Sequence, residues 1–520
     1  MSRPGPLAFF GFDAAEPTLL QRGVEEGWLP TVARLLVEGR AVRLAPVPSG
    51  FYNTSWSGAI TGTDVGVHEA VLDRRLSPGT YRIVDATADA TIATPFWKYL
   101  SDAGLRSTVA NIYSSGEIAG LLGTQVHGWG TIDPYWAKLG RTLYQPPDVE
   151  ELLTDAVGGR PKSLYYIPNP RTDADVRHYR DEILRSIDEH TRGLIALIDR
   201  TEWDFFFCSF DQSHQAGHLL WHLVDPAHRG HDAAADADLR DALPAIYRAV
   251  DASIGMLIER LPDEARVFVL TPHGMGPNYV SDPTSTILER GGWLVRRSGD
   301  RLDRSLRRSL WSLGRRVVPT RIRLAARNRM PQEGLLGDMQ LAHVDWSRTR
   351  AFALPSDLTA YVRVNLSGRE PEGTISPGRE YDDVCDELVS AFSSLVHVGS
   401  GLPATEKVIR CDELLGRPVD GALPDVCAVW ANHGPVRQLT SPVFGTIDLP
   451  FDDPRTGTHR HGGLVIGRGP GIAASNGGVL GENAGTLLDI APTALSLLGV
   501  EPPDQLVGTP LVDFTDGKEH

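Results

Sequence analysis

The stretch "DQSHQAGHLLWH", from Asp211 to His222, holds three histidines and an aspartate. Imidazole nitrogens are frequent ligands of transition metals and frequent proton carriers in catalysis. The stretch follows the apolar run "WDFFFCSF", which has the character of a buried strand. A single histidine near a strand end is more often a packed or surface residue than a ligand. A functional interpretation of this cluster therefore requires support from other parts of the chain.

Two other chemically capable residues also follow apolar runs. Asp13 ends the run "LAFFGFD", and His273 lies at the end of "ARVFVLTPHG". Runs that are nearly continuous in apolar residues are typical of parallel strands that are buried on both faces. In such sheets, ligands bind beyond the carboxyl ends of the strands. Asp13, the cluster at 211–218 and His273 all fall at predicted strand ends, which indicates one shared site.

Apolar residues at helical spacing lie between these predicted strands. They recur over residues 17–39, where we predict a helix, and again over 239–261. Strands that alternate with helices predict an α/β fold, in which a mostly parallel central sheet lies between helical layers.

The order of these patterns also predicts the domain organisation. We expect a core over residues 1–279, a basic helical insertion over 280–344, and a smaller α+β subdomain with a return to the core over 345–520. The strongly basic part of the insertion is 301–329. It is either a solvated helical face or a cap that attracts an anionic group toward the site.

Composition limits the class of protein. The chain has 520 residues, of which 41% are hydrophobic and 22% charged, as in soluble globular proteins. Its formal net charge of −15 disfavours binding to nucleic acid or to an anionic membrane. No run reaches the roughly 18 apolar residues of a membrane span, and the first residues lack a targeting pattern, so we expect a cytoplasmic protein. The four cysteines show no CxxC spacing, which argues against a disulfide framework or a thiolate metal site.

Motifs along most of the chain resemble those of one enzyme superfamily. In chain order they are "GFDAAEP", "TSWSGAITGTDVGVHE", "GHLLWHLVDP", "HGMG", "DWSRTRAFAL", "VNLSGREPEG", "LPDVCAVW", "GTHRHGG" and "LDIAPTALSLLGV". Their order and spacing, from about residue 7 to 512, resemble the alkaline phosphatase superfamily, and most of all its type I phosphodiesterase/nucleotide pyrophosphatase branch. The resemblance implies an alkaline phosphatase-like fold with two neighbouring metal ions, usually zinc. It also implies a nucleophile at a helix N-terminus that attacks phosphorus or sulfur.

The resemblance assigns ligands to both metals. Asp13 matches the aspartate that binds the metal on the nucleophile side, and His273 matches the histidine of the family's Asp-His-Gly motif. His218 and His459 match two histidines that bind the other metal. These four residues follow the family pattern.

One departure concerns the metal held by histidines. His214 stands four residues before His218, where the family has an aspartate ligand, so His214, His218 and His459 would give one metal three imidazoles. Such a set suits zinc and leaves a position for water or substrate, with iron or manganese as alternatives. Asp211 lies three residues too early for the family position. It is either a partner that fixes a ligating histidine or a reserve ligand.

A second departure weakens the other metal site. Pro272 occupies the place of the aspartate in Asp-His-Gly and offers no ligand. The nucleophile-side metal then keeps only Asp13 and His273 from the usual set. We therefore expect one tightly bound metal and a weak or empty second site.

The nucleophile position is the third departure. The family's nucleophile stands nine residues before the threonine of a Thr-Gly pair, and counting back from Thr61 reaches Tyr52. The Tyr52 phenol would attack phosphorus, bind metal as a phenolate, or orient the substrate. Thr54 and the neighbouring serines are replacement nucleophiles, and Asn53 is a candidate hydrogen-bond donor to a substrate oxygen.

Two functions follow from these residues. The first is a metal-dependent hydrolase or group transferase that acts on a phosphoester or related ester of a small anionic molecule. The alternative is a repurposed enzyme of the same fold, whose single three-histidine metal site catalyses a non-phosphoryl reaction on a small metabolite. A catalytically inactive binding protein is disfavoured because the histidines are intact. The number of bound metals separates these functions.

Overall fold

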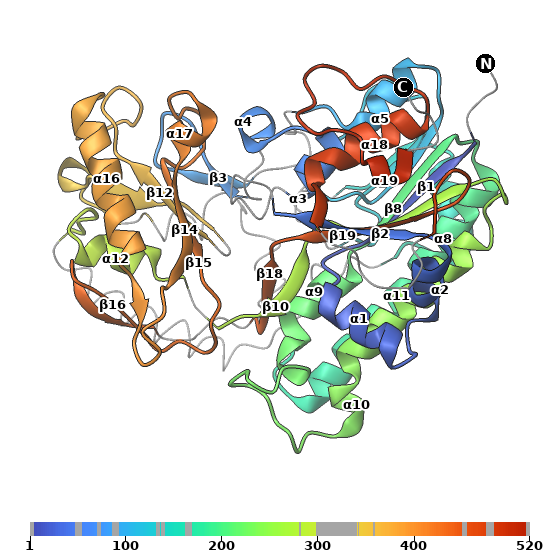
Figure 1. The fold of residues 1–520 in the computed structure, drawn as a ribbon, viewed down its shortest axis with the longest axis horizontal. Helices are drawn as coiled ribbons and strands as arrows, with labels where there is room; N and C mark the ends of the chain where they lie inside the picture. Colours follow the sequence, from blue (N-terminus) through green and yellow to red (C-terminus); the bar gives the residue numbers. More distant parts are fainter. Residues whose placement is uncertain are drawn as a thin grey trace. The chain divides into compact units, whose positions relative to one another are not determined.

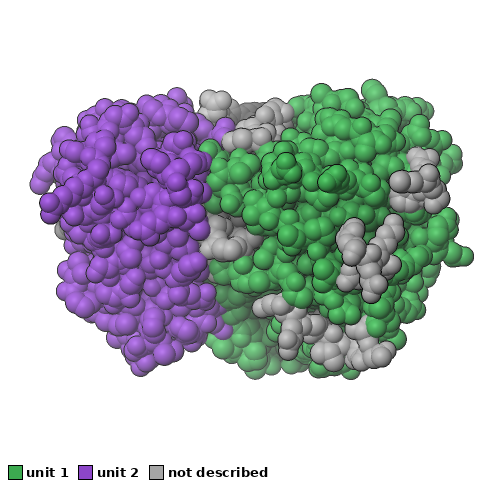
Figure 2. All heavy atoms as spheres, turned by 45° about the horizontal axis from the view of Figure 1, so that its top comes forward, with its two compact units in different colours: residues 1–70, 87–278, 454–520 green, residues 71–86, 279–453 purple. Residues whose placement is uncertain are grey.

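The chain forms two compact units in a computed structural model. The first unit comprises residues 1–70, 87–278 and 454–520, and the second comprises 71–86 and 279–453 (Figure 2). The structure describes residues 5–46, 55–69, 74–85, 93–131, 136, 141–161, 169–279, 282–297, 341, 343–356, 359–449, 455–474 and 483–515. Tyr52, Asn53, Thr54 and the basic segment 301–329 lie outside these ranges, so the predictions made for them remain predictions.

A nine-stranded sheet forms the centre of the first unit, in the order β20-β2-β19-β9-β1-β8-β5-β6-β7. Its strands are β1 (Leu7–Phe12), β2 (Arg40–Ala45), β5 (Ser107–Ala110), β6 (Gly123–His127), β7 (Leu143–Gln145), β8 (Phe205–Phe210), β9 (Arg266–Thr271), β19 (Gly463–Arg468) and β20 (Asn483–Thr486). The five strands from β9 to β6 in this order are mutually parallel, whereas β7 and β19 run antiparallel to their neighbours. The predicted mostly parallel sheet between helices is therefore confirmed.

Alternating side chains of the central strands fill two separate cores. In β1, Ala8, Phe10 and Phe12 belong to one core, whereas Leu7 and Phe9 belong to the other, as the two-residue period of a strand requires.

Helices cover both faces of the sheet (Figure 1). The first core includes α1 (Pro17–Glu25), α2 (Pro30–Glu38), α7 (Val149–Val157), α8 (Asp173–Arg200), α9 (Gln212–Leu220), α10 (Ala237–Arg240) and α11 (Ala242–Ile258). The second core includes α3 (Ser55–Thr61), α5 (Phe96–Asp102), α18 (Ile490–Leu497) and α19 (Val512–Thr515). The short helix α4 (Val65–His68) follows α3. Among the described residues, no helix has the length and apolar character that a bilayer span requires.

The helix predicted over residues 17–39 is wrong as a single element, because the structure divides it into α1 and α2. Gly27 adopts a φ of 76° after α1, a left-handed conformation that commonly follows a helix end. Pro30 then occupies the first position of α2, where the missing amide hydrogen costs nothing. The apolar spacing is helical on both sides of the break, so periodicity alone does not reveal it.

The second unit is built on antiparallel sheets. A four-stranded sheet has the order β11 (Ala351–Ala353), β12 (Thr359–Val364), β15 (Val426–Trp430) and β14 (Thr405–Arg410). Smaller sheets join β13 (Val396–His397), β16 (Gln438–Ser441) and β17 (Gly445–Asp448), and pair β3 (Arg74–Leu76) with β4 (Ile83–Asp85). Among the residues of this unit that the structure describes, the α-helices are α12 (Thr284–Arg290), α16 (Arg379–Ser393) and α17 (Cys411–Leu415).

The motif "VNLSGREPEG" has a structural role in the second unit. Arg369 donates two hydrogen bonds to Asp425, at 2.8 and 2.7 Å, and the Tyr381 hydroxyl donates a third at 2.8 Å. Asp425 is fully buried, so these donors compensate for the loss of its hydration.

Candidate metal centre

Loops at the carboxyl ends of β1, β8 and β9 bring the predicted ligands together. Asp13 follows β1 directly. Asp211 follows β8, and the next residue begins α9, which carries His214 and His218. His273 lies between β9 and β10 (Gly274–Pro277).

His459 reaches the same place by a separate route. It lies on β18 (Gly457–Arg460), which pairs antiparallel with β10. All five residues belong to the first unit.

The histidine side chains converge through their Nε2 atoms. His214 Nε2 lies 3.1 Å from His218 Nε2 and 2.8 Å from His459 Nε2. His214, His273 and His459 each offer a ligand atom within 4.8 Å of the others. Two nitrogen ligands of one tetrahedral zinc ion, each bound at about 2.0–2.1 Å, stand about 3.3 Å apart. The residues present therefore fit a transition-metal ion.

Backbone carbonyl groups orient two of these rings. His218 Nδ1 lies 2.9 Å from the Gly457 carbonyl oxygen, and His273 Nδ1 lies 3.3 Å from that of Gly274. A carbonyl oxygen only accepts hydrogen bonds, so each Nδ1 carries the hydrogen and leaves Nε2 with its lone pair. Both rings are thereby held in the tautomer that binds metal through Nε2.

Burial keeps His273 and His459 neutral, which is the state that metal binding requires. It lowers the pKa of His273 to about 4 and lowers the pKa of His459 well below its ordinary value. Burial alone would raise the pKa of Asp13, but nearby His214 and His273 and a hydrogen bond from Trp56 outweigh it, so this pKa is lowered. At neutral pH, Asp13 is therefore an ionised carboxylate, and His273 and His459 are neutral.

Each carboxylate oxygen of Asp13 has its own close contact. Oδ1 accepts a hydrogen bond from Trp56 Nε1 at 2.8 Å, and Oδ2 lies 2.8 Å from His214 Nδ1. His273 Nε2 lies farther away, 3.6 Å from Oδ1. The Ser213 hydroxyl donates to the Asp13 backbone carbonyl at 2.7 Å and ties α9 to the end of β1. Sequence analysis missed Trp56, although it lies in the quoted motif "TSWSGAITGTDVGVHE".

The carboxylate of Asp211 contacts a threonine hydroxyl. Its Oδ2 accepts a hydrogen bond from the Thr131 hydroxyl, and Asp211 does not belong to the compact group of His214, His273 and His459. Its predicted role as a partner or reserve ligand thus remains a prediction. His222 Nδ1 lies 3.2 Å from the Thr456 hydroxyl and also stands outside the group.

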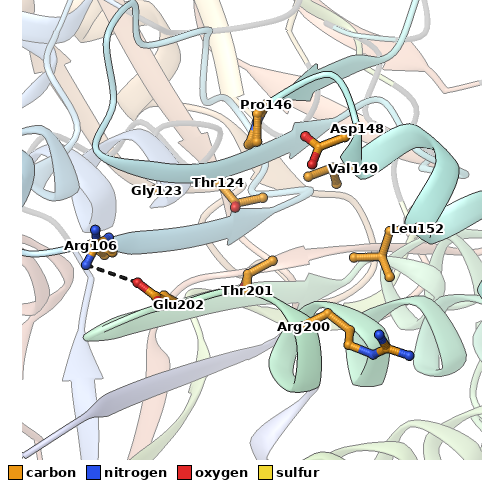
Figure 3. Close-up of a pocket in the computed structure, with 10 residues that line it drawn as sticks. All are labelled: Arg106, Gly123, Thr124, Pro146, Asp148, Val149, Leu152, Arg200, Thr201 and Glu202. Atoms are coloured by element: carbon orange, nitrogen blue, oxygen red, sulfur yellow. Dashed lines mark ion pairs between the residues drawn. The ribbon is translucent and has the colours of Figure 1, made fainter.

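A separate hollow of about 310 Å³ lies near the amino ends of β5 and β6, at the opposite end of these strands from the histidines (Figure 3). Arg106 and Glu202 form an ion pair at 3.1 Å on its wall. Because active sites of such sheets lie beyond the carboxyl ends of the strands, this hollow is not the candidate active site.

Comparison with known proteins identifies the family. The family model described as "Type I phosphodiesterase / nucleotide pyrophosphatase" matches residues 7–396. The chain belongs to this family. The resemblance to the phosphodiesterase/nucleotide pyrophosphatase branch is thus confirmed.

Individual relatives are distant. A 2,3-bisphosphoglycerate-independent phosphoglycerate mutase from Haloarcula marismortui is 36% identical over 119 residues, which are 22% of this chain and 21% of the mutase. The chain thus spans about a fifth of the length of the curated relatives it matches. The alkaline phosphatase PafA has a similar structure, with a TM-score of 0.50 and 13% identity over 99% of both chains, which supports the fold. A phosphonoacetate hydrolase from Sinorhizobium meliloti 1021 gives a TM-score of 0.48 and 14% identity over 96% of both chains.

Proposed function

We propose that this member of the type I phosphodiesterase family is a metal-dependent hydrolase that cleaves a phosphodiester or related ester of a small anionic molecule. The observation that carries this proposal is the convergence of His214, His218 and His459, whose Nε2 atoms lie 2.8 and 3.1 Å apart in the two closest pairs. The phosphoester class is supported by the family match over residues 7–396.

The proposed metal is a single tightly held zinc ion, for which iron and manganese are alternatives. His214, His218 and His459 would hold it, and His273, which offers a ligand atom within 4.8 Å of those of His214 and His459, is a further potential ligand. When bound, such an ion stabilises negative charge that develops on the ester oxygens. The buried and neutral state of His459 suits metal binding, because protonation would remove the lone pair.

Other residues have proposed roles in binding substrate. Tyr52 is proposed to position the ester, and Asn53 to donate a hydrogen bond to one of its oxygens. Thr54 is the replacement nucleophile if the reaction is covalent. We also propose a cytoplasmic location, which the four unpaired and buried cysteines support.

One sequence feature favours a second candidate function. Pro272 removes a carboxylate from the nucleophile-side metal site, and two-metal phosphoryl transfer requires both ions. The second candidate is therefore a one-metal enzyme of the same fold that catalyses a non-phosphoryl reaction on a small metabolite.

The proposed function is tested by metal analysis together with an activity assay. Protein purified in metal-supplemented medium should contain at least one equivalent of a transition metal and should hydrolyse a chromogenic phosphodiester, with activity lost on chelation and restored by zinc. Less than about a tenth of an equivalent of metal would refute the metal site. One equivalent of metal without hydrolysis of phosphodiesters or phosphomonoesters would favour the second candidate.

A further inference from the structure

A buried hydrogen-bonded chain links α3 to the histidine group through Asp13. The indole Nε1 of Trp56 donates to Asp13 Oδ1, and Asp13 Oδ2 contacts His214 Nδ1, both at 2.8 Å. The exposed fractions are 2% for Trp56, 0% for Asp13 and 7% for His214. The contacts among these three residues are therefore largely shielded from water. Hydrogen bonds to a charged group are strong in such an environment.

The two nitrogens of His214 face different partners. Nδ1 faces Asp13, whereas Nε2 faces His218 and His459. A metal bound to Nε2 at about 2.0–2.1 Å would lie on the far side of the ring, about 6 Å or more from Asp13 Oδ2. A zinc–carboxylate bond is only about 2.0–2.2 Å long. Oδ2 therefore cannot bind the ion that the histidines hold.

The second oxygen of Asp13 is also engaged. Oδ1 accepts the only hydrogen that an indole nitrogen offers, and this contact with Trp56 fixes the rotation of the carboxylate. A second metal bound to Oδ1 would share Oδ1 with Trp56. It would also find Pro272 where the family pattern has a further carboxylate ligand.

We infer that Asp13 is a positioning residue that orients His214 from outside the metal coordination sphere, instead of the metal ligand that the family pattern implies. This inference rests on the proposed metal site. The ionised Asp13 holds the hydrogen of His214 on Nδ1, directs its Nε2 lone pair at the ion and makes the ring more basic. Trp56 holds the carboxylate in place for that contact.

In this arrangement the carboxylate contacts the histidine, and the histidine binds the metal. The arrangement agrees with both departures from the family pattern, at His214 and at Pro272. His214 stands where the family has a carboxylate ligand, and a histidine, unlike a carboxylate, has a second nitrogen that requires a partner. Asp13 supplies this partner. Its negative charge also offsets part of the charge of a divalent ion held by neutral imidazoles.

The inference is tested in the 520-residue protein by measuring zinc stoichiometry, and by measuring zinc affinity through chelator competition. We expect Asp13→Asn to keep one equivalent of zinc and to weaken its binding about 10- to 100-fold, as loss of an outer partner typically does. Trp56→Phe should weaken binding by a smaller factor, because the carboxylate remains. Asp251→Asn is the matched control: Asp251 is also buried but accepts hydrogen bonds from the Thr31 and Val32 amides, so zinc affinity should not change.

Two results would overturn the inference that Asp13 is not a metal ligand. If wild-type protein binds two zinc ions and Asp13→Asn loses one whole equivalent while the other is unaffected, Asp13 is a ligand. A crystal structure of the zinc-loaded protein with an Asp13 oxygen at about 2.2 Å from zinc would show the same. Should Asp13→Asn fail to fold, Trp56→Phe and the zinc-loaded structure decide. Failure of the proposed function is distinguishable, since His214→Ala and His459→Ala would then leave the metal content unchanged.

Discussion

His459 Nε2 lies 2.8 Å from His214 Nε2, although 245 residues separate them in the chain. The close approach depends on Gly457 at the start of β18, whose carbonyl oxygen accepts a hydrogen bond from His218 Nδ1. A Cβ atom at Gly457 would lie 2.1 Å from the Gly217 carbonyl oxygen on α9. The histidine group therefore requires direct contact between the backbones of β18 and α9.

Substitution of Gly457 by alanine should separate β18 from α9. We expect Gly457→Ala to weaken zinc binding at least tenfold, because both His459 and the carbonyl partner of His218 move. Chelator competition measures the effect. Gly104→Ala is the comparison: a Cβ there meets nothing within 4 Å, although its φ of 80° imposes strain, so it should lower stability by about 1 kcal/mol without changing zinc affinity. Equal zinc affinities in both variants would contradict the prediction.

Loss of a ligating imidazole should remove the metal. His218→Ala and His459→Ala are each expected to retain less than about a fifth of the wild-type metal content, because two imidazoles bind zinc far more weakly than three. His222→Ala, which removes a ring that contacts Thr456 outside the group, should retain wild-type content. Elemental analysis of proteins prepared in parallel distinguishes these outcomes. A metal content that falls equally in all three variants would point to general destabilisation.

Restoration of the missing carboxylate should strengthen the second metal site. Pro272→Asp places a ligand beside His273 at the end of β9, so we expect it to increase both metal stoichiometry and phosphodiesterase activity. The increase in activity should appear only when zinc exceeds one equivalent. Two fully occupied sites in wild-type protein prepared without excess metal would show that the second site was never weak.

The fold and much of the candidate site could be predicted from sequence because local patterns encode them. β1, β8 and β9 are nearly continuous apolar runs. Asp13 follows β1 directly, and His273 lies two residues after the end of β9. The pairing of β10 with β18 has no such local signal, so only resemblance to a family placed His459 at the site. Helical periodicity also does not predict the contact between Trp56 and Asp13. A tryptophan in an apolar helix fits the same hydrophobic pattern as any other core residue.

The phenol at position 52 is expected to position substrate, without forming a covalent intermediate. A tyrosine oxygen extends several ångströms farther from the backbone than a threonine oxygen, so it does not replace the family's nucleophile in line. Tyr52→Phe should therefore keep its metal and retain activity within about tenfold, which corresponds to about 1.4 kcal/mol of barrier. Turnover assays and mass spectrometry of quenched protein test this. A phosphotyrosyl adduct on Tyr52 would contradict it, and loss of metal would identify Tyr52 as a ligand.

Stability should fall in mild acid because buried histidines must accept protons on unfolding. His190 lies between Asn111 and Gln212, and burial lowers its pKa to about 4, compared with about 6.5 for an unfolded histidine. Between these two values, the unfolded chain binds a proton that the native protein does not. The free energy of unfolding therefore decreases as the pH falls from about 6.5 toward 4, by up to about 1.4 kcal/mol per pH unit for this residue.

The contribution of His190 can be isolated by substitution. We expect His190→Gln to show a shallower loss of stability below pH 6.5 than wild type, by up to about 1.4 kcal/mol per pH unit, because one buried titrating group is gone. His178→Gln serves as the control, since His178 is an exposed histidine on α8. Urea unfolding at a series of pH values, with all proteins at the same zinc loading, gives these slopes. A His190→Gln slope identical to that of wild type would mean that burial does not lower the pKa of this ring.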